Sequence, residues 1–356
     1  MANKTLNENI NQAISDFKGI KQALIDKGVE IPQGTPTSEY GAKIEGMKGG
    51  LDTSRITDFE RFCQNNRIPA DYLSGLDTRN GTNFNQMFYN CTNLTTAPQL
   101  DLSNGTSFNQ MFSSCSNLAT VPQLDLSNGT NFNQMFYNCT NLATVAKLDT
   151  RSGTNFNQMF SGCSNLTTAP QLDTSNGTSF GSMFEYCNKL TTVPQLDTSN
   201  GTSFYNVFRQ CSDLTEIPQL DTRNGTNFSQ MFYGCSKLKT VELDTSKGTS
   251  FSYMFYRCSK LTTVGLRSFV AQANMFDSCS TLTNLTVTGT ITVAATNALK
   301  LSYSTKLTVE SLLSVLNALA DNTGKTTYNI QLGSTNLAKL TDEQKAIATN
   351  KNYTLS

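Results

Sequence analysis

Ten cysteines are the first residues of this chain that could do chemistry, because thiolates bind zinc, form disulfides and act as nucleophiles. They occur singly, mostly 24 residues apart, and never as a close pair such as Cys-x-x-Cys. A zinc site or a disulfide framework would need such pairs. We therefore expect a row of reduced, buried cysteines, with disulfides between neighbouring repeats as the alternative. The residues are Cys63, Cys91, Cys115, Cys139, Cys163, Cys187, Cys211, Cys235, Cys258 and Cys279.

A row of aspartates is the second candidate, because carboxylates are ligands that calcium prefers. One aspartate follows a leucine in each repeat. Carboxylates ~5 Å apart in an effective dielectric of ~20 repel each other by ~3 kcal/mol, so each needs a compensating partner. We expect each to accept hydrogen bonds from backbone N–H groups of its own turn, with a row of calcium ions as the alternative. The row is Asp52, Asp77, Asp101, Asp125, Asp149, Asp173, Asp197, Asp221 and Asp244.

The residues needed for common catalytic sites are missing. The chain has no histidine, which excludes Ser-His and Cys-His nucleophile systems and most catalytic zinc sites. No pair of carboxylates stands apart from the repeat for acid–base catalysis, and there is neither a Walker loop nor a dinucleotide fingerprint. We therefore predict a non-enzymatic protein with no catalytic, cofactor-binding or metal-binding residues. The Asn-Gly-Thr sequences resemble glycosylation sites, and their regularity favours turn chemistry instead.

All these residues belong to a phrase of 24 residues, which first occurs complete from Leu76 as LDTRNGTNFNQMFYNCTNLTTAPQ. The period shortens to 23 where a Pro-Gln pair is lost, before Leu243 and Leu266. A fixed period of this size is typical of a stacked solenoid, with one supersecondary unit in each turn. We predict an α/β repeat solenoid, a leucine-rich-repeat-like stack of 23–25-residue turns. The phrase returns at Leu100, Leu124, Leu148, Leu172, Leu196 and Leu220.

One repeat predicts a turn, a short helix and a short strand. Phe84, Met87, Phe88 and Cys91 follow the i, i+3, i+4, i+7 spacing of a helix face. Residues 94–97 alternate less regularly and are rich in threonine, which favours a short strand that Pro98 ends. Stacked repeats would then form one narrow parallel sheet, with the short helices on the opposite side.

The position after Met-Phe varies most between repeats, so packing does not dictate it. The sequence places it on the outward face of the expected helix, where tyrosine offers contact area at low entropic cost. We predict that Tyr89, Tyr137, Tyr233, Tyr256 and Arg209 contact a ligand or partner, with a solvated surface as the alternative. The full set is Tyr89, Ser113, Tyr137, Ser161, Glu185, Arg209, Tyr233, Tyr256 and Asp277.

The two ends depart from the repeat. Residues 1–48 contain an expected helix with one apolar face, followed by a linker; we expect this segment to attach the protein to a partner or to a second copy of itself. Residues 49–285 form the expected solenoid, beginning with a degenerate turn at residues 51–69. Residues 286–356 are expected to cap its open end with helices at 309–319 and 337–349 and strands at 326–332 and 353–355. The apolar face of the first helix consists of Leu6, Ile10, Ala13, Phe17, Ile20 and Leu24.

The charge and hydropathy of the chain argue against two classes of partner. Lys and Arg total 27, as do Asp and Glu, so the net charge is zero. A nucleic-acid partner would need a basic face, and anionic membranes would not attract a neutral one. No apolar stretch is long enough to insert into a membrane, and the first residues lack the apolar core of a signal peptide.

The repeat resembles the BspA-like leucine-rich repeats of bacterial surface proteins, through the pattern MFxxCxxLxxVxxLDTS. Its uniform length and added Asn-Gly-Thr turn depart from that family. The matching residues of one repeat are Met183, Phe184, Cys187, Leu190, Val193, Leu196, Asp197, Thr198 and Ser199.

A second resemblance concerns the two ends. Residues 20–44 (IKQALIDKGVEIPQGTPTSEYGAKI) are similar to N-terminal segments of phage virion proteins. Residues 330–355 (IQLGSTNLAKLTDEQKAIATNKNYTL) are similar to C-terminal segments of leucine-rich-repeat proteins encoded among phage structural genes. This implies a virion protein of the tail-fibre type, made in the host cytoplasm. Its N-terminal helix would bind other virion proteins, and its solenoid would adhere to a host cell-surface protein or glycan. A purely architectural capsid decoration or head fibre protein, and a bacterial surface adhesin, are the alternatives.

Overall fold

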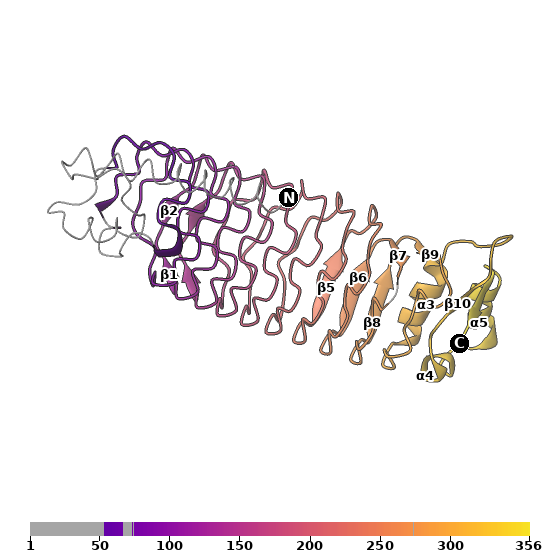
Figure 1. The fold of residues 1–356 in the computed structure, drawn as a ribbon. Coiled ribbons are helices and arrows are strands. Elements are labelled where there is room, and N and C mark those ends of the chain that lie inside the picture. Colours follow the sequence, from indigo (N-terminus) through magenta and orange to yellow (C-terminus); the bar gives the residue numbers. More distant parts are fainter. Residues whose placement is uncertain (1–52, 67–72, 74, 273) are drawn as a thin grey trace, which may run out of the picture.

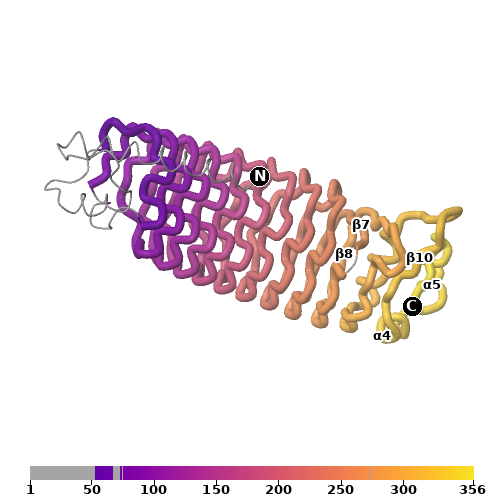
Figure 2. Tube along the Cα trace, in the orientation of Figure 1, coloured from indigo at the N-terminus to yellow at the C-terminus, as the bar shows by residue number. Residues whose placement is uncertain are grey.

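The chain forms a solenoid of parallel turns, here called coils, stacked along one axis into a long rod (Figures 1 and 2). The computed structural model describes residues 53–66, 73, 75–272 and 274–356. Each coil pairs in register with the equivalent residues of the next, as in Thr120 with Thr144 and Thr240 with Thr263. The predicted solenoid is therefore confirmed. The helix predicted from Leu6 to Leu24, including Ile10, Ala13, Phe17 and Ile20, lies outside the described residues.

The regular elements are short, and every pair of strands in the described part of the chain is parallel. Within the described residues, five separate small sheets, β1–β3, β2–β4, β5–β6–β8, β7–β9 and β10–β11, replace the single sheet that the sequence predicts. The strands are β1 (Thr120–Val121), β2 (Leu124–Asp125), β3 (Thr144–Val145), β4 (Leu148–Asp149), β5 (Thr240–Leu243), β6 (Thr263–Leu266), β7 (Phe269–Ala271), β8 (Asn284–Val287), β9 (Ile291–Val293), β10 (Tyr328–Ile330) and β11 (Tyr353–Leu355). The helices are η2 (Gln64–Asn66), α3 (Val309–Ala318), α4 (Ser334–Leu337) and α5 (Asp342–Thr349).

The short helix predicted in each repeat is wrong, because residues 84–91 and their equivalents form a ladder of turns. The N–H of Gln86 donates to the carbonyl of Asn109 at 2.9 Å, and that of Asn90 to Ser113 at 2.8 Å. Both donors have left-handed backbone angles, with φ of 55° and 57°. A helix would bond each N–H within its own segment. Here alternate N–H groups bond to the next coil instead, and the left-handed residues bend the chain. We call this side of the rod the turn ladder.

The apolar pattern of the turn ladder nevertheless fills the core, as the sequence predicts. Phe84, Met87 and Phe88 are 0% exposed, and Cys91 is 3% exposed. Equivalent phenylalanines stack face to face along the rod, with ring centroids 5.6 Å apart between Phe84 and Phe108. Two such columns of rings therefore run through successive coils beside the cysteines.

The cysteines form the expected reduced row. All ten are free and buried, so the alternative of disulfides between coils is not what the structure shows. Each Sγ from Cys115 onward donates to a phenylalanine carbonyl of the preceding coil, as from Cys115 to Phe88 at 3.0 Å. Burial raises the pKa of Cys139 and of Cys279 to about 12.

We expect the native thiols to resist alkylation. Because the thiolate is the nucleophile, a raised pKa and burial both suppress its reaction at neutral or mildly alkaline pH. Mass spectrometry after iodoacetamide treatment should find the cysteines unmodified in the native protein and all ten modified in guanidinium chloride. Rapid native labelling of Cys163 or Cys211, deep in the stack, would contradict the buried row.

The side of the coil opposite the turn ladder changes when the period shortens. In the 24-residue coils, two residues separate the inward-facing Val121 from the inward-facing Leu124. These two residues, Pro122 and Gln123, lie between β1 and β2 and keep them from forming one strand. Side chains of a strand alternate between its faces, so two intervening residues cannot both fit a regular strand. In β5 only Glu242 separates the buried Val241 and Leu243, and the strand continues unbroken. We call the first type of coil bulged and the second type flat.

The C-terminal end of the stack is covered by α3, which contacts β8 and α5. The side chain of Thr308 caps the start of α3 by accepting from the N–H of Ser311. At the other end, the ammonium of Lys351 donates to the carbonyls of Leu316, Asn317 and Leu319 at 2.7–3.3 Å. These bonds satisfy the last carbonyls of the helix, which have no partner within it.

Candidate functional site

The aspartate row is explained by its turns. Asp173 accepts from the N–H of Ser175 at 3.1 Å and from its hydroxyl at 2.7 Å, and the same pattern recurs at Asp101 and Asp197. The bonds from Ser175 hold the pKa of Asp173 below its usual value. The predicted turn role is therefore confirmed. Within residues 53–66, 73, 75–272 and 274–356, no group of three or more His, Cys, Asp or Glu could hold a metal ion.

The variable position after Met-Phe forms one column along the turn ladder, here called the variable column. The N–H that follows each member donates to the carbonyl of the next, as from Gly234 to Tyr256 at 2.8 Å. The sequence predicts that this column faces outward. In the structure it does not, because stacking covers it from both sides. Ser113, Ser161 and Glu185 are 1%, 3% and 9% exposed, and the tyrosines of the column are half-buried.

Only part of the predicted ligand site comes together. Tyr89 and Tyr137 are separated by the coil that carries Ser113, and no ring contact joins them among the described residues. Tyr233 and Tyr256 stack directly, with ring centroids 5.0 Å apart. The guanidinium of Arg209 lies 5.1 Å from the centroid of Tyr233.

Three neighbouring residues extend this group. Arg209 forms an ion pair with Glu185 at 2.8 Å, donates to the hydroxyl of Tyr186, and lies 4.9 Å from the centroid of the Tyr186 ring. Tyr253 packs edge-on against Tyr256 at 5.5 Å. Tyr186 is 43% exposed and Tyr253 is 37% exposed. Together they form what we call the tyrosine–arginine cluster: Glu185, Tyr186, Arg209, Tyr233, Tyr253 and Tyr256.

The cluster replaces a regular surface of amides. In earlier coils, glutamines bond side chain to side chain along the rod, as from Gln134 to Gln158 at 2.7 Å. This ladder ends after Gln158, and Tyr253 later occupies the same column. Sequence reasoning did not place Glu185 in this cluster and did not single out Tyr186 or Tyr253. The sequence did contain a signal for the cluster: the glutamine column and the variable column both depart from their usual residues in the same coils.

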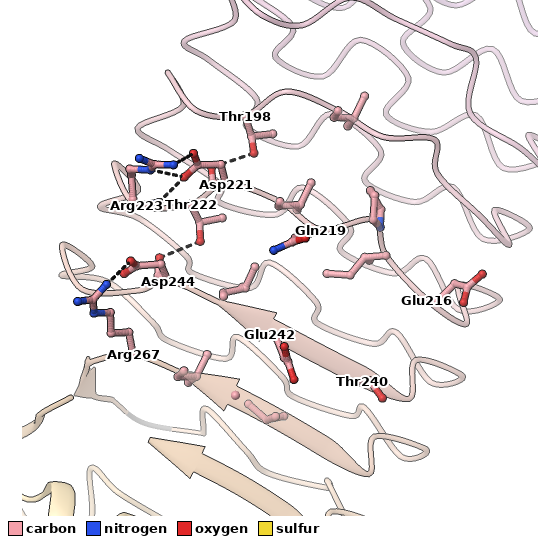
Figure 3. A pocket seen from close by; sticks show the side chains of 18 of the residues that line it. Thr198, Glu216, Gln219, Asp221, Thr222, Arg223, Thr240, Glu242, Asp244 and Arg267 are labelled. Atoms are coloured by element: carbon pink, nitrogen blue, oxygen red, sulfur yellow. Dashed lines mark hydrogen bonds and ion pairs between the residues drawn. The ribbon is translucent and has the colours of Figure 1, made fainter. Parts of the chain in front are cut away.

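A groove lies on the side of the rod opposite the turn ladder, where bulged coils meet the flat strands β5, β6 and β8 (Figure 3). One side carries the ion pairs Arg223–Asp221 and Arg267–Asp244, and Glu216 and Thr240 lie on the other. Glu242 lies between them (Figure 3). Sequence reasoning did not find this groove, although the loss of the Pro-Gln pair marks its position.

No helix in the described part of the chain is long and apolar enough to cross a membrane.

Two solved structures show distant likenesses to the chain. A leucine-rich repeat protein from Bacteroides ovatus ATCC 8483 is 15% identical over 77% of this chain and 86% of its own, with a TM-score of 0.29. TLR13, solved in a TLR13–ssRNA13 complex, is 14% identical over 78% of this chain and 38% of its own, with a TM-score of 0.28. Likenesses this weak support no statement about a ligand.

No curated protein matches the chain. One family model, described as "Mycoplasma protein of unknown function, DUF285", matches residues 40–144, 106–214, 168–268 and 191–288. The matches overlap because neighbouring coils have nearly the same sequence, and together they span more than half of the chain. The chain therefore belongs to the family described as "Mycoplasma protein of unknown function, DUF285".

Proposed function

We propose that this protein is a non-catalytic binding scaffold whose tyrosine–arginine cluster contacts a partner molecule. The observation that carries the proposal is the position of Tyr186 and Tyr253, partly exposed on either side of a fixed Arg209. Tyrosine and arginine dominate the energetics of many interfaces. Rings already held by stacking lose little entropy when a partner covers them.

The proposed partner is a protein or glycan on a cell surface. Two resemblances support a place on a virion: residues 20–44 are similar to segments of phage virion proteins, and residues 330–355 to segments of leucine-rich-repeat proteins encoded among phage structural genes. In that case residues 1–48 bind other virion proteins and the rod projects outward as an adhesive module. Immunogold labelling of particles with an antibody against the solenoid would test this placement. Unlabelled particles would contradict it and favour a bacterial surface adhesin.

We expect the triple variant Tyr186→Ala, Arg209→Ala, Tyr253→Ala to lose binding to cells at least tenfold. Each truncation removes exposed contact area or the cation that orders it, and hot-spot truncations cost ~2 kcal/mol or more. Fluorescently labelled protein can be titrated onto a panel of bacterial cells by flow cytometry, with circular dichroism confirming the fold of the variant.

The matched control is the double variant Tyr89→Ala, Tyr137→Ala, which removes tyrosines of the same column outside the cluster. It should bind cells like the unsubstituted protein. If the triple variant binds equally well, or if both variants lose binding to the same extent, the cluster is not the contact surface. The purely architectural role, as a capsid decoration or head fibre protein, would then be favoured.

A further inference from the structure

We propose that the groove across β5, β6 and β8 binds an extended, positively charged segment of a partner protein. This site lies on the opposite side of the coil from the tyrosine–arginine cluster, so it is a second binding surface, independent of the proposed function.

The groove arises from the change in coil type. The bulged coils on one side present Pro218 and Gln219, which also line the groove. The flat strands beyond them have one residue each at the equivalent position: Glu242, Gly265 and Thr286. Gly265 has no side chain, so the middle of the floor is low and is bordered by the side chain of Glu242. Its backbone lies outside the left-handed region, so its conformation does not require a glycine.

The size of the groove fits a polymer better than a small molecule. It holds about 1520 Å³, whereas small-molecule pockets hold ~300–1,000 Å³. From Gln195 to Thr286 it crosses four coil steps of ~4.8 Å, and an extended peptide rises ~3.3 Å per residue. About six residues of extended chain would therefore span it.

The charges of the groove select a cation. Asp221 and Asp244 are neutralised by Arg223 and Arg267, as described above. Asp197 lines the groove too, and its carboxylate accepts from the N–H and hydroxyl of Ser199 in its own turn. Glu216 and Glu242 are exposed, and neither forms an ion pair with another described residue. The surplus carboxylates attract lysine or arginine side chains and repel phosphates, nucleic acids and acidic glycans.

The remaining lining favours a polypeptide over a neutral sugar. No aromatic side chain occurs among the described residues that line the groove, so a sugar ring has no surface on which to stack. Instead, Thr240, Thr263 and Thr286 line it, with hydroxyls that can both donate to and accept from a peptide backbone.

The test is the affinity of the full chain for N-acetylated hexalysine amide, measured by isothermal titration calorimetry. We expect the double variant Glu216→Gln, Glu242→Gln to weaken this binding at least tenfold. The matched control, Glu310→Gln, removes an exposed carboxylate from α3 outside the groove and should bind like the unsubstituted protein. Hexaglutamate should not bind.

A second variant separates shape from simple charge attraction. Gly265→Leu leaves every charge in place but fills the floor, since its Cβ would lie 3.3 Å from Cγ of Glu242. It should also weaken hexalysine binding tenfold, with its fold checked by thermal melting. Equal binding by Gly265→Leu and the unsubstituted protein, or tighter binding of a neutral oligosaccharide than of hexalysine, would overturn the proposal. The triple cluster variant should bind hexalysine normally, so failure of the two proposed sites can be told apart.

Discussion

Replacing Phe132 with alanine should lower the free energy of unfolding by about 3–5 kcal/mol, the usual cost of deleting a buried ring. Phe132 is 0% exposed and stacks between two others, with centroids 5.8 Å from Phe108 and 5.5 Å from Phe156. The neighbouring coils are fixed by their own ladder bonds, so they cannot collapse into the cavity. Urea unfolding followed by circular dichroism would measure the loss.

Two observations would check the cause. Tyr303→Ala removes an aromatic ring that is 51% exposed, and should cost no more than about 1 kcal/mol. Hydrogen exchange should show the loss of protection centred on the coils that contact Phe132, because each coil of a solenoid contacts mainly its neighbours. A uniform loss of protection along the whole rod would contradict this local effect.

Replacing Gly129 with alanine should destabilise the protein by about 1–3 kcal/mol through overpacking. A Cβ on Gly129 would lie 2.7 Å from Cε2 of Phe108 and 2.7 Å from Cζ of Phe132. Both rings are held by the stack, so neither can move away without disturbing its neighbours. The loss can be measured by urea unfolding, as for Phe132.

Gly75→Ala is the matched control for this substitution. Nothing lies within 4 Å of a Cβ at Gly75, and alanine there should leave stability within about 0.5 kcal/mol. If the two glycine variants unfold alike, the rings around Gly129 are less firmly held than their stacking indicates.

Burial within a coil could be predicted from the sequence, whereas its backbone could not. The spacing of Phe84, Met87, Phe88 and Cys91 identified four buried residues correctly. The same spacing suits a ladder of turns, because a left-handed residue at every fourth position also returns side chains to one face. Gly162 and Gly234, both with positive φ, occupy the column of Asn90 and were the signal for this geometry.

The proposed binding surfaces could be predicted only in part, because they depend on contacts between coils. Arg209, Tyr233 and Tyr256 could be singled out by comparing one position, the one after Met-Phe, between the repeats. The roles of Tyr186 and Tyr253 required knowing which columns lie side by side. The groove required knowing that a coil with one residue fewer lies flat, which the loss of the Pro-Gln pair does not reveal by itself.

The in-register pairing of equivalent residues makes coils of the same type interchangeable in the stack. Thr120 bonds beside Thr144 in the same way that Thr240 bonds beside Thr263. Loss or duplication of one whole repeat in the gene would therefore join the same surfaces again, and the rod would change length by ~4.8 Å. Recombination between near-identical repeats would thus change the length of the rod in fixed steps, while both ends stay the same.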